Sequence, residues 1–460
     1  MRNTRPYTYL GTIQGMCGQC KALVPSRIIG ENGSVFQERL CPSCGKAKTL
    51  IAESSEWYNE IMKTTVLCKD TLVPGNPVQN GCPKDCGPCQ FHANACLFPV
   101  FPITNAGDLD CPICLAGNKH EKPYFMSGKE IKNLLDKVIS RSGQVDLINI
   151  TGGEPTMHPD LLSLLDECNR SKIGKIAIST SGVRLSEDEQ LCRELAKRNV
   201  SVILPFNTFK SEIAVKIHGS DVVAKKLQAL ENFNRFGVAV NLLYEMVESL
   251  TDLEIGNIIN LAKEFPVIHG ITVNTMSPTN TSSGNFRPRR SIPLDRAARI
   301  IAEAMNGKMK REHFFPHPNA HPLCRSMALF LKTKDSFHSL TNLFPTKRLR
   351  EILFGGYILT ADEKIKSELE EAANRIGAEG GNENLFQGVK NLITDLYPPD
   401  KALSRFEKQN FWGKNILTIF LHAYMNEDTF DLARIVACPE QVLEPGGRMI
   451  PACLYNLSRA

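Results

Sequence analysis

The feature that most constrains the fold is a regular alternation of short apolar segments and longer amphipathic segments between residues 97 and 276. Apolar runs such as LFPVFPIT (97–104) and VSVILPF (200–206) are predicted strands, whereas GKEIKNLLDKVISRS (128–142) has the apolar spacing of a helix. The pattern corresponds to roughly six β/α units. Because strands that alternate with amphipathic helices form a parallel sheet covered by helices, we expect an α/β fold, a partial (β/α)6 barrel.

Composition narrows the function classes. The chain has 460 residues, of which 42% are hydrophobic and 22% charged, the values of an ordinary globular protein. A net charge of +5 gives no argument for nucleic-acid binding at this length. The N-terminal segment has no apolar signal core, and no apolar run reaches the length of a membrane span. We therefore expect a cytoplasmic protein.

Sixteen cysteines are many for such a chain, and in a reducing cytosol clustered cysteines indicate metal ligands rather than disulfides. The N-terminal segment contains two C-x-x-C knuckles, MCGQC and LCPSCG. Their four thiols make a tetrahedral metal site: Cys17, Cys20, Cys41 and Cys44. Zinc and a rubredoxin-type mononuclear iron use the same ligands, so the spacing leaves both metals open.

A second group of cysteines follows in NGCPKDCGPCQFHANAC. The C-x-x-x-C-x-x-C core has the spacing of an iron–sulfur site, and one more cysteine supplies a fourth ligand: Cys82, Cys86, Cys89 and Cys96. Four thiolates would saturate a [4Fe–4S] cluster, which suits electron transfer or structure. A second zinc site is the alternative, because zinc shares the preference for thiolates.

Two motifs lie at the ends of the first predicted strands. After 97–104 comes GDLDCPICLAG, in which Cys111 and Cys114 have C-x-x-C spacing. The second strand ends in TGGEP, where Gly152 and Gly153 form a tight turn and Glu154 adds a carboxylate. In parallel α/β folds ligands bind at this carboxyl edge of the sheet. A tight turn without a ligand would explain TGGEP alone, but its position after a cysteine loop favours a site.

The remaining chain carries weaker signals. The basic RPRR run (287–290) would bind phosphate or carboxylate, or form a solvated turn. The C-terminal third has a mostly helical pattern and contains three widely spaced cysteines: Cys324, Cys438 and Cys453. Cys168 and Cys192 lie on predicted helix faces, where we expect buried core thiols.

Together, these motifs resemble those of radical S-adenosylmethionine (SAM) enzymes. More narrowly, the chain resembles the archaeal tetraether-lipid-synthase-like group, whose members were earlier viewed as tetrahydromethanopterin methylases. The resemblance extends over nearly the whole chain and includes KIHGSD (216–221), HPLC (321–324), FDLARIVAC (430–438) and PGGRMIPACLYN (445–456). It implies a partial barrel of radical SAM type with an N-terminal four-cysteine metal module and a mostly helical C-terminal extension.

The resemblance also implies roles for single residues. Cys111 and Cys114 match ligands of the [4Fe–4S] cluster that cleaves SAM. The motif that holds the SAM amino group is matched by Gly152, Gly153 and Glu154. Residues expected around the rest of SAM follow at later strand ends: Ser179, Thr180, Ser181, Asn207, Asn274 and Thr275. The second group of cysteines matches one auxiliary cluster, and Cys324, Cys438 and Cys453 match another.

Gly107 departs from the family pattern, because it stands where C-x-x-x-C-x-x-C requires the first cysteine. Cys96 lies before the strand and Gly107 after it, roughly 25 Å apart along an extended chain, so Cys96 is a poor substitute. Carboxylates of Asp108 or Asp110 match iron–sulfur chemistry poorly. The loop is therefore built like a SAM-cluster loop that lacks one ligand.

The family implies a radical SAM-type iron–sulfur enzyme that acts on C–H bonds, by carbon–carbon coupling or methylation of a lipid or pterin substrate. It also implies an electron donor such as ferredoxin or flavodoxin, and a lipid substrate leaves a peripheral membrane contact open. Two alternatives remain: an iron–sulfur protein that binds clusters without making a radical, and a zinc-stapled scaffold protein.

We expect four regions along the chain. These are the rubredoxin-like or zinc-ribbon-like metal module (1–75), an auxiliary iron–sulfur segment (76–97), the partial barrel (98–290) and the extension that carries further cluster ligands (291–460).

Overall fold

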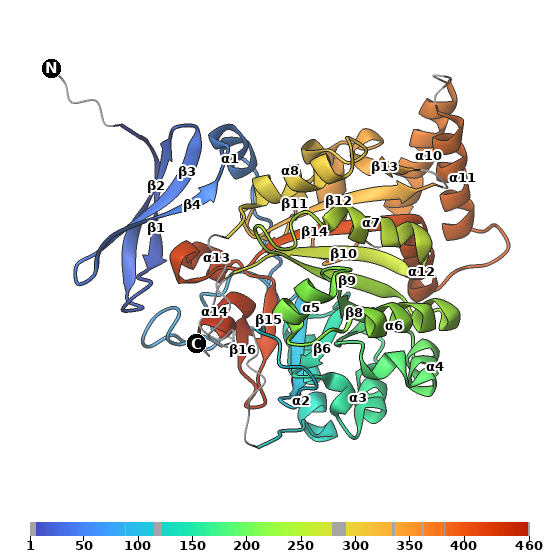
Figure 1. The fold of residues 1–460 in the computed structure, drawn as a ribbon, viewed down its shortest axis with the longest axis horizontal. Helices are drawn as coiled ribbons and strands as arrows, with labels where there is room; N and C mark the ends of the chain where they lie inside the picture. Colours follow the sequence, from blue (N-terminus) through green and yellow to red (C-terminus); the bar gives the residue numbers. More distant parts are fainter. Residues whose placement is uncertain are drawn as a thin grey trace.

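The computed structural model describes residues 6–87, 89–114, 122–277, 291–333, 336–359, 363–378, 380 and 382–458. The basic RPRR run lies outside the described residues. Two sheets organise the chain, a small antiparallel sheet near the N-terminus and a large mixed sheet that contains the predicted parallel strands (Figure 1).

The predicted parallel strands form the centre of the large sheet and lie side by side in chain order. They are β5 (Phe98–Thr104), β6 (Ile148–Gly152), β7 (Ile176–Ser179), β8 (Val200–Pro205), β9 (Val240–Met246) and β10 (Ile268–Thr275). Each pairs in parallel with the next. The α/β fold expected from the alternating pattern is therefore confirmed.

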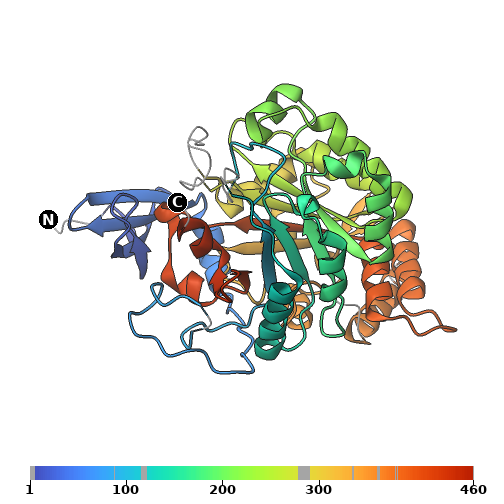
Figure 2. The same cartoon turned by 90° about the horizontal axis from the view of Figure 1, so that it is seen from below.

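Helices cover the outer side of this curved sheet (Figure 2). They are α2 (Gly128–Ser142), α3 (Leu161–Cys168), α4 (Glu189–Lys197), α5 (Ser211–His218), α6 (Val223–Phe236), α7 (Ile255–Glu264) and α8 (Leu294–Ala304). Strand β9 shows how the two sides differ, because Leu242, Tyr244 and Met246 are buried in the core under the helices. The alternate residues Asn241 and Leu243 face the inside of the curve. Cys168 and Cys192 are fully buried, as expected for core thiols.

The C-terminal extension adds strands to both ends of the parallel core. Strand β14 (Ile416–Ala423) pairs in parallel with β10, and β15 (Glu440–Leu443) pairs in parallel with β5. Antiparallel strands β11 (Phe315–Pro316), β12 (Arg325–Lys332), β13 (Phe337–Ser339) and β16 (Met449–Pro451) complete the sheet. The sequence pattern predicts a mostly helical region here and misses these strands, because short apolar runs do not distinguish a strand from a helix.

Further helices accompany those strands in the described part of the extension. They are α9 (Thr346–Leu353), α10 (Glu363–Ala378), α11 (Glu383–Leu396), α12 (Arg405–Asn415), α13 (Leu432–Val436) and α14 (Ala452–Ser458). A second apolar core forms where α9 to α12 pack on β12 and β14. This packing places α12 beside β10, a position that closes one end of the barrel.

The N-terminal module contains β1 (Thr8–Met16), β2 (Leu23–Glu31), β3 (Ser34–Cys41), β4 (Gly45–Ala52) and α1 (Ser55–Met62). It packs on the segment before α13, far along the chain. The buried guanidinium of Arg39 pairs with Asp428 at 2.7 Å and donates to the Glu427 carbonyl at 2.9 Å. Gln37 donates to the Phe430 carbonyl at 2.9 Å. The module is thereby attached to the C-terminal extension.

Among the helices of the described residues, none combines the length and the apolar character that crossing a membrane requires.

Candidate active site and metal centres

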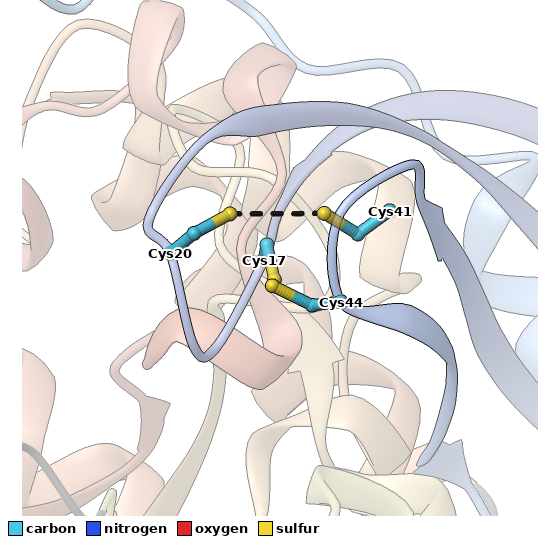
Figure 3. A group of neighbouring side chains, drawn as sticks. All are labelled: Cys17, Cys20, Cys41 and Cys44. Carbon is cyan, nitrogen blue, oxygen red and sulfur yellow. Dashed lines mark hydrogen bonds between the residues drawn. The ribbon is translucent and has the colours of Figure 1, made fainter.

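The four cysteines of the N-terminal module meet at one point. All four Sγ atoms lie within 4.8 Å of one another, with two sulfurs from each C-x-x-C turn (Figure 3). A tetrahedral site with metal–sulfur bonds of about 2.3 Å separates its sulfurs by about 3.8 Å. The Sγ atoms of Cys20 and Cys41 are 3.7 Å apart. The backbone N–H groups of Cys20 and Gln19 lower the pKa of Cys17 to about 6, which favours the thiolate that a metal needs. These residues fit a four-thiolate metal ion.

The second group of cysteines lies in the segment before β5. Cys82, Cys86 and Cys89 are within electrostatic reach of one another, since burial, with a smaller contribution from the other two thiols, raises the pKa of Cys86 to about 12. Cys96 is buried just before β5. Burial lowers the pKa of Arg141, and the thiols of Cys89 and Cys96 both act against that shift, so both lie near its guanidinium. Their ligation of one cluster stays a prediction.

The three widely spaced cysteines of the C-terminal extension lie near one another, with Arg434 beside Cys324. Its Nε donates to Cys324 Sγ at 3.1 Å. Burial raises the pKa of Cys438 well above its usual value, and the nearby Cys453, Glu440 and Cys324 add to the shift. Cys324 thus lies near Cys438 and Cys453, which follow it by more than a hundred residues in the chain. Their ligation of one cluster stays a prediction.

The TGGEP turn is held against the loop that follows β5. Gly153 and Glu154 donate backbone hydrogen bonds to the carbonyls of Thr104 and Ala106, at 2.8 and 2.6 Å. Gly152 has φ +149°, and a Cβ atom there would lie 2.2 Å from the Thr104 oxygen. Only glycine tolerates this approach of two backbones. The turn therefore positions the Cys111–Cys114 loop, which begins directly after Ala106.

The Glu154 side chain connects the ends of β6 and β7 through hydrogen bonds. Its buried carboxylate accepts hydrogen bonds from Thr156, from the Thr180 hydroxyl at 2.7 Å and from the Ser181 N–H at 2.7 Å. The Ser181 hydroxyl in turn donates to Asp108 at 2.6 Å. The ends of β6 and β7 and the cysteine loop are therefore joined by one hydrogen-bonded network.

Two residues beside the cysteine loop have no counterpart among the residues expected from sequence. The buried Lys226 ammonium donates to His218 Nε2 at 3.1 Å and to the Pro205 carbonyl at 2.6 Å. This arrangement leaves the proton on His218 Nδ1, which lies 3.8 Å from Cys111 Sγ. Cys111, Asp108 and Glu154 all act on the pKa of Lys226, which burial lowers to about 8. His218 belongs to the KIHGSD motif, and this motif was the sequence feature that could have identified it.

The other predicted SAM-pocket residues lie at the same edge of the sheet. Asn207 accepts from the Glu245 N–H at 2.7 Å, and Asn274 donates to the Glu245 carboxylate at 2.6 Å. Ser179 donates to Asn149 at 3.0 Å. Thr275 ends β10 and is buried.

The described residues fit SAM and the cleaving cluster to different degrees. For SAM, the half-buried Gly152 and Gly153 line a cavity beside the network described above. For the cluster, Cys111 and Cys114 offer two thiolates, position 107 has no side chain, and Asp108 is engaged by Ser181. The described residues therefore do not complete a three-ligand iron–sulfur site.

A cavity of about 370 Å³ occupies the inside of the curved sheet. At one end it is lined by Gly152, Gly153 and Asn274, at the carboxyl ends of their strands. At the other end it is lined by Lys175 and His269, at the amino ends of β7 and β10. The cavity thus runs through the barrel from the predicted SAM turn to its base.

Aromatic side chains and one buried ion pair form the cavity wall that the C-terminal extension supplies. The rings of Phe98 and Tyr357 stack with centroids 4.3 Å apart, and the Arg325 guanidinium lies 4.6 Å from the Tyr357 centroid. Arg325 pairs with Glu440 at 3.0 Å, and Tyr424 donates to the same carboxylate at 2.7 Å. Such a wall suits a flat, partly polar ring.

Several buried polar atoms in the cavity wall have no hydrogen-bond partner within the described part of the chain. They are Asn241 Oδ1, His269 Nδ1, Asn274 Oδ1 and both side-chain polar atoms of Gln409. Because buried polar groups are nearly always paired, these atoms indicate a ligand that supplies the missing partners. The sequence signal was present as polar residues within apolar strands, such as Asn241 in VNLLYEM and His269 in IHGITVNT.

Comparison with known proteins agrees with this architecture. Residues 76–262 match the radical SAM superfamily, and residues 9–53 match the HMPTM N-terminal zinc ribbon domain. The chain is 25% identical to a 7,8-dihydro-6-hydroxymethylpterin dimethyltransferase of Methanocaldococcus jannaschii, over 96% of this chain and 92% of that protein. It is 31% identical to the mycofactocin maturase MftC of Mycobacterium ulcerans, over 32% of this chain and 38% of that protein.

A solved structure also matches part of the fold. The crystal structure of Streptococcus suis SuiB bound to S-adenosylmethionine matches 46% of this chain and 47% of that chain, with 20% identity and a TM-score of 0.39.

Proposed function

We propose, from the premise that this chain is a radical SAM superfamily protein with an N-terminal zinc ribbon, that it methylates a small pterin-like heterocycle inside its barrel. The observation that carries the proposal is the cavity of about 370 Å³, which begins at the Gly152–Gly153 turn and continues into the barrel. The similarity to a pterin dimethyltransferase supports it, because that similarity spans nearly both full chains.

The size and lining of the cavity favour a heterocycle over a lipid. Cavities that bind small molecules have volumes of roughly 300 to 1,000 Å³, and this one is at the lower end of that range. Two long alkyl chains would need a larger space, and they would leave the amides of Asn241 and Gln409 without partners. A pterin ring has donors and acceptors along its edge, and its flat face suits contact with the aromatic side chains of the cavity wall.

Residues of the chain would hold the two reactants end to end. The Gly152–Gly153 backbone would bind the amino group of SAM, and the Glu154 network would keep that turn rigid. When bound, SAM would supply a transferable methyl group and a cleavable carbon–sulfur bond. The aromatic wall would exclude water and orient the substrate ring towards that end of the cavity. A ferredoxin or flavodoxin is the proposed electron donor, and zinc is the proposed metal of the N-terminal site.

One observation favours a second candidate function. Gly107 leaves the cysteine loop with two thiolates, which suits an iron–sulfur protein that binds clusters but has little or no radical chemistry. The two candidates make different predictions for the same variant. If the barrel retains the machinery, Gly107→Cys restores the missing ligand. If the barrel has lost radical chemistry, the added thiol increases neither the bound iron nor the cleavage of SAM.

The test compares wild type, Gly107→Cys and a matched control, Gly128→Cys, after anaerobic iron–sulfur reconstitution. Gly128 lies at the exposed start of α2, where a Cβ atom meets nothing within 4 Å. We expect Gly107→Cys alone to gain about four iron atoms per chain. With dithionite, SAM and 7,8-dihydro-6-hydroxymethylpterin, it should form 5′-deoxyadenosine and methylated pterin faster than wild type. SAM cleavage without any pterin methylation would contradict the substrate, and absence of both products in both proteins would favour the second candidate.

A further inference from the structure

The base of the cavity has an unusual set of polar groups for a buried site. Lys175 precedes β7, His269 is near the start of β10, and Gln409 projects from α12, and all three line the same end of the cavity. Gln409 is 5% exposed, and neither its oxygen nor its nitrogen has a partner among the described residues. An unpaired amide at this depth indicates a missing ligand.

Positive charge accumulates at this base without a matching carboxylate. Burial lowers the pKa of Lys175 to about 8, and no charged or hydrogen-bonding group of the described residues contributes to that shift. After burial, the charged groups that lower the pKa of His269 are Lys175, Lys332 and Lys414, and no carboxylate acts against them. Three ammonium groups around one imidazole create a positive potential that an anion would neutralise.

Helix α12 packs directly against His269 and closes the base of the cavity. A Cβ atom at Gly413 would lie 2.3 Å from His269 Nδ1, so the helix backbone runs directly against the imidazole. Trp412, which precedes Gly413 on the same helix, is buried and lines the cavity. The base is therefore a built enclosure of one helix and several strand ends, with donors on more than one side.

We propose that the base of the cavity binds an oxyanion of the substrate, a phosphate or a carboxylate, through Lys175, His269 and Gln409. The rest of the substrate extends along the aromatic wall towards Gly152. The distance suits this arrangement, because His269 and Asn274 are five residues apart on β10, or roughly 16 Å along a strand. This inference deepens the proposed function, on which it rests for the identity of the cavity as a substrate site, by assigning the substrate an anionic group at the end opposite the reacting carbon.

The test uses Trp412 as a reporter at the site. The chain has two tryptophans, so Trp57→Phe leaves Trp412 as the only one, and this background serves for all proteins. The reconstituted full chain is titrated with inorganic phosphate, pyrophosphate and acetate at constant ionic strength while the fluorescence of Trp412 is recorded. We expect a saturable change, and the anion that binds most tightly identifies the oxyanion as phosphate or carboxylate.

Variants at Lys175 decide whether the signal comes from the proposed site. Lys175→Met should weaken the best anion at least tenfold, because a charge-assisted hydrogen bond is lost. Lys175→Arg, which keeps the charge, should bind within a few-fold of the parent. Lys132→Met, which removes an exposed lysine of α2, is the matched control and should bind unchanged. Circular dichroism and the thermal midpoint establish that each variant is folded.

Two results would overturn the proposal: no saturable change with any of the anions, or equal affinity in Lys175→Met and the parent. The readout requires neither SAM cleavage nor the iron–sulfur cluster. A chain that binds an oxyanion through Lys175 but methylates nothing contradicts the proposed function alone. Undiminished methylation of a neutral pterin by Lys175→Met contradicts the anion site alone.

Discussion

Replacing Arg325 with methionine should destabilise the protein strongly, because the change isolates a buried carboxylate. Arg325 and Glu440 both lie in the cavity wall, with side chains 5% and 7% exposed, and their charged atoms are 3.0 Å apart. In Arg325→Met, Glu440 keeps the hydrogen bond from Tyr424 but loses its only ionic partner among the described residues. Removing one member of a buried pair costs about 3 to 5 kcal/mol.

The exposed ion pair of Arg299 supplies the matched control. Its side chain is 50% exposed and pairs with Glu53 and Glu303 at 2.9 Å on the surface of α8. Exposed pairs contribute roughly 0 to 1 kcal/mol, so Arg299→Met should change the free energy of unfolding by no more than that. The double variant Arg325→Met, Glu440→Gln should recover part of the loss, because the stranded charge is gone.

The measurement is the thermal midpoint and the urea midpoint of each purified chain under anaerobic conditions. At about 2 °C per kcal/mol for a large domain, Arg325→Met should lower the thermal midpoint by about 6 °C or more. If Arg325→Met and Arg299→Met shift the midpoints equally, the reasoning from burial is refuted. If the double variant is no more stable than Arg325→Met, the loss comes from packing on Tyr357 rather than from the stranded carboxylate.

Three further outcomes follow from the site. Cys44→Ser should lower bound zinc by about one per chain and leave iron unchanged in metal analysis, whereas a fall in iron would place iron at the four-thiolate site. Gly152→Ala should weaken SAM binding, measured by calorimetry, and lower stability by roughly 1 to 3 kcal/mol, because the new Cβ would lie 2.2 Å from the Thr104 oxygen; Gly128→Ala is the control, and equal effects would contradict the steric argument. Burial raises the pKa of Glu245 from 4.5 to about 7, so its protonated form contributes stability that is complete below pH 4.5 and is lost as the pH rises through 7. Glu245→Gln should remove that part of the pH dependence in urea titrations from pH 5 to 8, and an unchanged slope would count against it.

The sequence predicts those parts of the fold that are encoded locally. Strands β5 to β10 and helix α2 appear in the alternating pattern because each segment carries its own periodicity. The sequence pattern does not predict that β14 pairs with β10, or that β15 pairs with β5. Those pairings join residues more than a hundred positions apart, and the periodicity of a strand does not specify its neighbour.

The same distinction applies to the candidate site. C-x-x-C spacing is a local property, so Cys17, Cys20, Cys41 and Cys44 could be grouped from the sequence, and their convergence is confirmed. Lys175, Lys226 and Gln409 are ordinary polar residues of helices and strand ends in the sequence. Their chemical interest comes from burial and from the groups that tertiary structure places around them, which no local spacing encodes.

The pairing of β15 with β5 has a consequence for the order in which the molecule is assembled. More than 300 residues separate the two strands, which at roughly 5 to 20 residues per second means that a ribosome needs at least about 15 s to deliver the partner. During this interval the edge of β5 is unpaired and open to pairing with other chains. The N-terminal four-cysteine module is complete long before then, but Glu427 and Asp428, on which it docks, are still unmade. A nascent chain therefore passes through a stage in which a finished metal module is tethered to an open sheet, and protection of that edge by a chaperone would raise the yield of intact protein.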